Sequence, residues 1–308
     1  MQYFTMKSKI NWYLFIFIFT IAFSGCSGCK KGKNKEAANQ DVNVQVDEQV
    51  MNDFNQAKKI FYSMPSPLET AMLIKTAGAT YNEKLLNPLS KASTYTTNKS
   101  MALNLGIYTT DLSFASLFDQ TQTSINYMQA AKKMADGLGI LDAIDNNTIQ
   151  KLEENVNNRD VIMDIISETF MSSSSFLKEN DRTAIASVVL VGGWVEGLYI
   201  GTQLVDPSNL KHNKLLERIV DQKLSLDIVM KLLNENKDNS DVASLIVVMK
   251  ELKSVFDKIQ IKTSKIEPVL DNKTNITTLK SESKISVSTE VFKDLTYKVK
   301  AIRTNFTL

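Results

Sequence analysis

Two carboxylates stand in apolar surroundings, and their type and setting favour acid–base chemistry. Glu196 is the one charged residue of the apolar segment 184–205, and Asp111 lies within segment 105–118, LGIYTTDLSFASLF. A carboxylate in such a segment must be paired or have a shifted pKa. A shifted pKa is in turn typical of a functional acid or base. Glu196 is therefore the leading candidate for a functional acid, and Asp111 is a second carboxylate that would face it across a cleft.

Each carboxylate also has a structural interpretation, which the sequence favours. Arg182, Lys75 or a helix end can pair with Glu196, which would then fix the register of its helix. Thr110 or Asp111 can cap a helix that follows. The sequence does not fix the distance between the two carboxylates, so a glycosidase-like arrangement stays without support.

Three aromatic residues near these carboxylates are candidates for lining a groove or pocket: Tyr108, Trp194 and Tyr199. Helical phase places Tyr199 on the same stripe as Glu196. Aromatic side chains offer a large apolar surface and, in Tyr and Trp, a polar tip that can meet a ligand. The same residue types also serve as ordinary core, and the sequence favours that interpretation.

Composition and motifs exclude several classes of protein. The chain has 308 residues with 36 basic and 34 acidic side chains, a net charge of +2, which excludes a strongly basic nucleic-acid binder. Two cysteines and one histidine, His212, exclude a disulfide scaffold, a zinc finger and a histidine-rich metal site. No phosphate loop, G-x-S-x-G or H-E-x-x-H motif occurs. We therefore expect no cofactor and favour a binding or scaffold role over catalysis.

The apolar segment 184–205 must position Glu196. Gly193, Gly197 and Gly201 recur every four residues within it, and such a ridge lets a second helix approach closely. The segment is long enough to span a membrane. A glutamate at mid-bilayer costs about 3 kcal/mol, so we expect a central helix buried within a bundle, with membrane insertion as the alternative.

Other segments carry helix signals. Ser66-Pro67-Leu68-Glu69 matches a capping box that opens a helix ending at Gly78. Further helices are predicted for 120–136, after Asn158, and after Asp181. Glycine and proline are too sparse for a β-sandwich or barrel.

The C-terminal third adds an expected pair of antiparallel helices joined by the loop 234–240, then a linker at 262–285 and a last helix that packs back. The predicted fold class is all-α, a multi-helix bundle with a central buried Gly-rich helix and a C-terminal helix packing onto it. The expected domains are a leader at 1–25, a flexible tether at 26–47, a helical bundle at 48–261, and the linker plus last helix at 262–308.

The N-terminus is predicted to be a targeting segment rather than part of the fold. Lys7 and Lys9 precede an uncharged stretch, Trp12 to Phe23, that is too short to span a membrane and is typical of a secretory signal peptide. Ser24-Gly25-Cys26 resembles the lipobox of bacterial lipoproteins, although Phe23 departs from the usual Leu. A redox interpretation of Cys26 and Cys29 as C-x-x-C is disfavoured, because the motif directly follows an apolar leader.

The lipobox resemblance implies diacylglyceryl modification and acylation, for example by palmitate, of Cys26 after cleavage. Several acyl chains together would anchor the chain stably to a membrane. Surface-exposed lipoproteins of Bacteroidota usually carry an acidic stretch after this cysteine. None is present here, so the resemblance implies a domain that faces the periplasm, and inner and outer membrane both stay open.

The body also resembles a group of helical lipoproteins of Bacteroidota. The resemblance lies in segments 105–122, 155–160 and 191–204 and in the terminal VKAIRTNF. It implies an exported helical domain and transfers no catalytic residue. We therefore expect a lipid-anchored envelope protein that binds an envelope protein or a small molecule. The alternatives are an envelope hydrolase using Asp111 and Glu196, and a protein that inserts residues 184–205 into a membrane.

Overall fold

The computed structural model describes the chain from residue 66 onward, with short gaps. The described residues are 66–141, 150–152, 154–155, 158–211, 213–263, 267–271, 276–280 and 283–308. The predicted signal peptide, Cys26, the tether and His212 lie outside them. Helix accounts for 77% of the described part, so the predicted all-α multi-helix bundle is confirmed.

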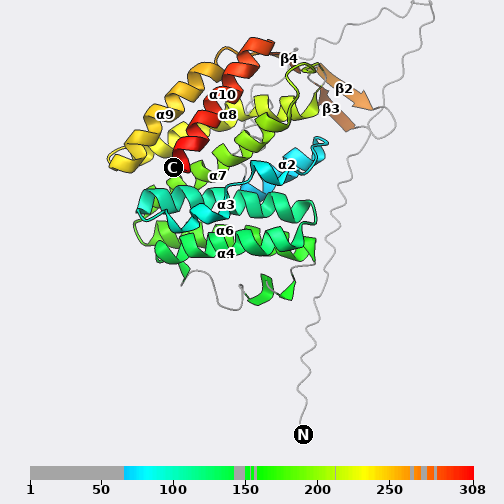
Figure 1. The fold of residues 1–308 in the computed structure, drawn as a ribbon. Helices are drawn as coiled ribbons and strands as arrows, with labels where there is room; N and C mark the ends of the chain where they lie inside the picture. Colours follow the sequence, from blue (N-terminus) through cyan, green and yellow to red (C-terminus); the bar gives the residue numbers. More distant parts are fainter. Residues whose placement is uncertain are drawn as a thin grey trace, which may run out of the picture. The chain divides into compact units, whose positions relative to one another are not determined.

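The helices and strands follow one another along the chain as shown in Figure 1. The α-helices are α2 (Pro67–Thr76), α3 (Asn98–Leu117), α4 (Thr121–Gly137), α6 (Arg159–Glu179), α7 (Thr183–Leu204), α8 (Lys214–Glu235), α9 (Ser240–Phe256) and α10 (Thr289–Phe306). Two short 3-10 helices, η1 (Glu83–Leu85) and η2 (Leu89–Ser93), lie between α2 and α3. Four short strands, β1 (Gln260–Thr263), β2 (Glu267–Asp271), β3 (Ile276–Lys280) and β4 (Ser283–Ser286), precede α10.

Local capping explains where several helices begin. The Ser66 hydroxyl accepts from the Glu69 amide at 3.2 Å, and the Glu69 carboxylate accepts from the Ser66 amide at 2.6 Å, so the predicted capping box is present. Gly78, just past the end of α2, has φ 88°, a backbone conformation that favours glycine. These short-range signals act within one turn, which is why the sequence alone reveals them.

Two predicted caps are wrong. Thr110 and Asp111 lie inside α3, which begins earlier because Thr97 accepts from the Ser100 amide at 3.1 Å. Asp181 adopts φ 57° and does not cap α7, whose N-cap position is Arg182 with no side-chain hydrogen bond. Helix α3 is buried along most of its length, so no polar stripe marks its true start in the sequence.

Helices α3 and α7 cross at backbone contact. A Cβ on Gly106 of α3 would lie 2.0 Å from the carbonyl oxygen of Val189, and one on Gly192 of α7 would lie 2.1 Å from that of Leu103. The tightest approach to α3 comes from Gly192, which lies outside the predicted ridge. Within that ridge, a Cβ on Gly197 would lie 2.0 Å from Thr70 of α2, and a Cβ on Gly201 would have its nearest atom, in Ile219 of α8, at 3.5 Å. The missing side chains let the two helix axes come close.

Helix α7 is the central helix of the bundle. It packs against α3, α10, α8 and α2, and every residue from Val191 to Thr202 is buried. Its length and apolar composition would allow it to cross a membrane, yet 78% of its most apolar stretch is buried inside the protein. The burial favours the expected interior helix.

The C-terminal third holds an antiparallel pair and a returning helix. Helices α8 and α9 are antiparallel, because Asp227 pairs with Lys253 at 3.1 Å while Lys223 pairs with Asp257 at 3.8 Å. Helix α10 packs onto α7, α9 and α3, as predicted.

Between α9 and α10 the expected linker contains strands. Strand β1 pairs antiparallel with β4, and β2 pairs antiparallel with β3. Each strand is so short that its alternation of apolar and polar residues cannot be distinguished from a Lys- and Thr-rich linker in the sequence.

Candidate functional site

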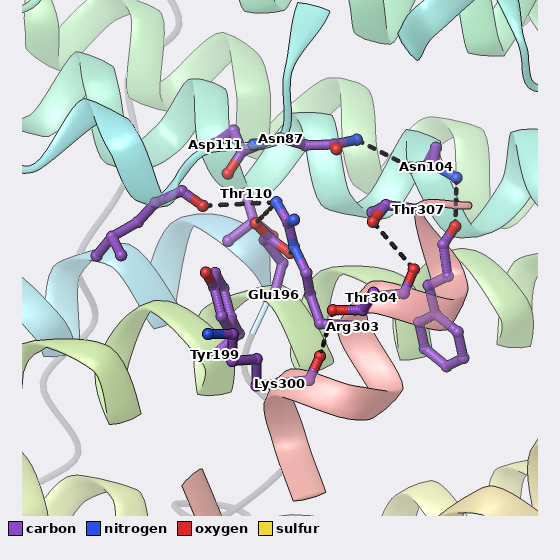
Figure 2. A network of polar contacts seen from close by, with 12 residues as sticks. Asn87, Asn104, Thr110, Asp111, Glu196, Tyr199, Lys300, Arg303, Thr304 and Thr307 are labelled. Carbon is purple, nitrogen blue, oxygen red and sulfur yellow. Dashed lines mark hydrogen bonds and ion pairs between the residues drawn. The ribbon is translucent and has the colours of Figure 1, made fainter. Parts of the chain in front are cut away.

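Glu196 lies in the interior of the bundle and is paired with an arginine from the last helix. The Arg303 guanidinium donates from Nε to Glu196 Oε2 at 2.9 Å and from Nη2 to Oε1 at 3.0 Å (Figure 2). The Glu196 side chain has no exposed surface, and that of Arg303 is 11% exposed. Two parallel hydrogen bonds of this kind fix both geometry and charge.

The predicted partners of Glu196 are wrong. Arg182 donates to the carbonyl of Leu138 at 2.8 Å, and Lys75 donates to the carbonyl of Leu117. Both side chains instead satisfy carbonyls near the C-terminal ends of α3 and α4. The true partner, Arg303, lies 107 residues from Glu196 along the chain, beyond the reach of any local pattern.

Arg303 has two further contacts that hold it in place. Its guanidinium carbon lies 4.8 Å from the centre of the Tyr199 ring, a cation–π geometry. Its Nη2 also approaches the carbonyl oxygen of Leu85 at 3.5 Å. Burial alone lowers the pKa of Arg303, but the Glu196 charge outweighs it and raises the pKa, so the arginine stays charged.

Asp111 lies in the same buried cluster, so the structure brings the two predicted carboxylates together. Its Oδ2 accepts from the Asn87 amide at 2.9 Å, whereas its Oδ1 is buried with no donor among the described groups. Burial, and then the charge of Glu196, raise the pKa of Asp111 well above its ordinary value. Burial also raises the pKa of Glu196, but the charge of Arg303 lowers it, so a proton on this pair of carboxyls favours Asp111.

Asn87 extends this cluster toward the end of α10. Its side-chain amide donates to Tyr95 at 3.2 Å and to the Asn104 oxygen at 3.1 Å. Asn104 in turn donates to the carbonyl of Phe306 at 2.9 Å (Figure 2). Sequence reasoning missed Asn87 and Asn104, because a lone asparagine in a loop or helix gives no signal of burial.

The three predicted aromatics do not line one groove. Tyr108 is fully buried and donates to the carbonyl of Pro88 at 3.2 Å, on the loop side of the cluster. Tyr199 stacks on Arg303 as described above. Trp194 is 2% exposed and donates to Gln222 of α8 at 2.9 Å. They serve as core residues, and the polar tips of Tyr108 and Trp194 are hydrogen-bonded.

The cluster of Asp111, Glu196 and Arg303 lacks the access that hydrolysis needs. Asp111 and Glu196 have no exposed surface, whereas a general acid or base must reach the proton of a bound substrate. Within the described residues no group of three or more histidine, cysteine, aspartate or glutamate side chains could hold a metal. The arrangement suits a structural ion pair that ties α10 to α3 and α7.

Space for a ligand lies elsewhere, among α3, α4, α6 and α7. A cavity of about 100 Å³ opens there between mostly apolar side chains. The lining residues are Leu105, Thr109, Leu112, Met128, Ala131, Lys132, Ala135, Ile140, Leu141, Leu152, Ile166, Thr169, Phe170, Ser173, Leu177, Ala186, Val189 and Leu190. None of the predicted site residues is among them. Within this described lining, the small side chains of the alanines and the serine are the feature of the sequence that is associated with the open space.

Comparisons of the chain with protein-family models, with curated proteins and with solved structures found no match.

Proposed function

We propose that this chain is a bacterial lipoprotein whose helical domain is held at a membrane of the cell envelope and faces the periplasm. The apolar leader and the lipobox-like Ser24-Gly25-Cys26 support this proposal. Acylation of Cys26 by more than one chain would give a stable anchor, whereas a single chain binds marginally.

The helical domain acts as a binding module for a small apolar molecule. The apolar cavity among α3, α4, α6 and α7 carries this proposal. Ligand sites in proteins are typically concave and mostly apolar with a few polar groups, and helical bundles place them between helices. An anchored protein beside a lipid leaflet would also meet apolar molecules at high local concentration.

A catalytic role has less support. The groups able to do acid–base chemistry, Asp111 and Glu196, are dry and mutually paired, while the cavity wall among the described residues lacks any carboxylate. The carboxylates that could act as acid or base thus lie away from the cavity that could hold a ligand, so binding without turnover fits the arrangement better.

The anchor is tested by metabolic labelling with an alkyne fatty acid. The parent chain is expected to incorporate the label, and Cys26→Ala is expected to lose it together with membrane association. Cys29→Ala is the matched control and should keep the label. Retained label in Cys26→Ala would contradict the proposed anchor.

Binding in the cavity is tested with a photoreactive neutral probe, a decyl chain bearing a diazirine, added to membranes that carry the full chain. Cross-links are expected on the wall segments 128–135 and 166–177, mapped by peptide mass spectrometry. Ala131→Phe places a ring in the cavity and is expected to lower labelling about tenfold, since the probe and ring compete for one space.

Ala243→Phe, on the exposed face of α9, makes the same change outside the cavity and should label like the parent. Circular dichroism verifies that both variants keep their helix content. Labelling that Ala131→Phe leaves intact would refute binding at this place.

A further inference from the structure

Residues along three turns of α6 line the cavity. Its lining residues on α6 run from Ile166 to Leu177, which is about 16 Å of helix at 1.5 Å per residue. The space between the helices is only about 100 Å³. An engineered cavity of about 150 Å³ accepts a compact ring such as benzene. A smaller volume spread over three helical turns fits a single extended chain better than a ring.

The described lining of the cavity carries one charge. Lys132 is the only charged residue among the lining residues, its side chain is exposed, and it forms no ion pair or hydrogen bond within the described part of the chain. The exposed acids Asp136, four residues after Lys132 on α4, and Glu168 on α6 do not line the cavity, and no ion pair between either of them and Lys132 is formed. An anionic group at the rim would therefore meet an unpaired cation.

A second polar group on the wall also lacks a partner. The Thr169 hydroxyl oxygen is buried and makes no hydrogen bond within the described residues. In a helix, a threonine hydroxyl ordinarily donates to the carbonyl four residues earlier, as Thr109 does here to Leu105 at 2.7 Å. A buried hydroxyl without a partner is costly, and a polar ligand atom would relieve that cost.

We infer that the cavity binds a single-chain lipid carboxylate, a free fatty acid, with its chain along α6 and its carboxylate at Lys132. This inference rests on the proposed binding of an apolar molecule in the cavity and adds the ligand class. The apolar wall takes up the chain, and Lys132 supplies the counter-charge.

The test measures displacement of the photoreactive decyl probe from membranes carrying the full chain, at mildly alkaline pH where the carboxylate is ionised. Decanoate, decanol and decyltrimethylammonium share one chain length and differ in charge. Each is compared at equal concentration within the membrane, so that partitioning into lipid cancels. Decanoate is expected to displace the probe best and the quaternary ammonium worst.

Two lysine variants locate the charge. Lys132→Gln is expected to weaken decanoate about threefold, the order of an exposed ion pair, and to leave decanol unchanged. Lys132→Arg should restore the preference. Lys133→Gln removes the same charge from the next residue, which does not line the cavity, and should behave as the parent.

The outcomes separate the two proposals. Equal displacement by decanoate and decanol, or an equal loss in Lys133→Gln, overturns the fatty-acid assignment and leaves apolar binding standing. Failure of all three compounds to displace the probe, or of the probe to label the cavity, overturns both. A decanoate preference that Lys132→Gln abolishes supports the inference.

Discussion

The two sides of the crossing between α3 and α7 differ in what they enclose. One side holds Asp111, Glu196 and Arg303, where the two carboxyl groups have no exposed surface and Glu196 and Arg303 form an ion pair. The other side holds a mostly apolar cavity, and Lys132 is the single charge among the described residues that line it. The same two helices contribute to both, since Leu105 and Val189 line the cavity while Asp111 and Glu196 point into the polar cluster.

The difference shows how polar residues divide their roles in this bundle. A buried ion pair pays a desolvation penalty and is retained where it fixes which elements meet. An apolar wall does not specify which elements meet in this way, and it can leave room for a ligand. We therefore assign the polar cluster to holding α10 in place and the cavity to binding.

Breaking the ion pair is expected to have the largest effect. Arg303→Met leaves the Glu196 charge buried without its partner, which costs about 3–5 kcal/mol of unfolding free energy. Thermal unfolding followed by circular dichroism measures the loss. Adding Glu196→Gln to Arg303→Met should recover much of it, and a double variant as unstable as Arg303→Met would contradict the pairing.

Changes at the crossing of α3 and α7 are expected to have the second-largest effect on stability. Gly106→Ala places a Cβ against the Val189 carbonyl and must push α3 and α7 apart, at about 1–3 kcal/mol. Gly201→Ala, whose nearest neighbour would be 3.5 Å away, should be neutral or gain up to about 1 kcal/mol of helix propensity. Equal effects of the two changes in chemical denaturation would show that the close approach is unimportant.

The pH dependence of stability tests the protonation of Asp111. Its pKa in the folded protein is raised, so the folded state binds a proton that the unfolded state releases. The stabilising contribution is present below the ordinary pKa of an aspartate and is lost as the pH rises through the raised value. Asp111→Asn has no proton to release and should remove this loss, so at pH values above the raised pKa its stability exceeds that of the parent.

Denaturation curves at several pH values measure this slope for both proteins. Asp206, which is exposed and has a lowered pKa through its hydrogen bonds to Ser208, provides a control variant, Asp206→Asn. That change should leave the decline through the raised pKa of Asp111 intact. An unaltered decline in Asp111→Asn would assign the proton elsewhere.

The smallest expected effects on stability come from substituting two threonines, one at the crossing and one on the cavity wall. Thr110 is buried and its hydroxyl contacts the carbonyls of Gly106 and Gly193 at 3.1 Å each, so Thr110→Val should cost about 1 kcal/mol. Thr169 has no partner for its hydroxyl, so Thr169→Val should leave stability nearly unchanged. A comparable loss in both variants would mean that the cavity hydroxyl is satisfied in solution.

Much of the fold is predictable from sequence because its signals are local. The capping box at Ser66, the apolar run of α7 and the apolar face of α10 each act within a few turns of one helix. The wrong caps at Asp111 and Asp181 arose where burial on all sides or an unusual backbone conformation removed the local pattern.

The site was predictable only in part. Asp111 and Glu196 stand out because a carboxylate amid apolar residues is conspicuous in any sequence. Their partner Arg303 and the asparagines Asn87 and Asn104 are ordinary residues until the chain folds, because nothing in their own segments distinguishes them. No single residue in the sequence indicates that the cavity is present.

The sequence by itself determined the helical class, the burial of α7 and the presence of two carboxylates that needed an explanation. Only the tertiary structure decided that these carboxylates lie in one buried cluster, that Arg303 pairs with Glu196, and that space opens on the other side of α3. Periodicity and capping act between neighbours in the chain. Ion pairs and cavities depend on which distant surfaces meet and how closely they pack.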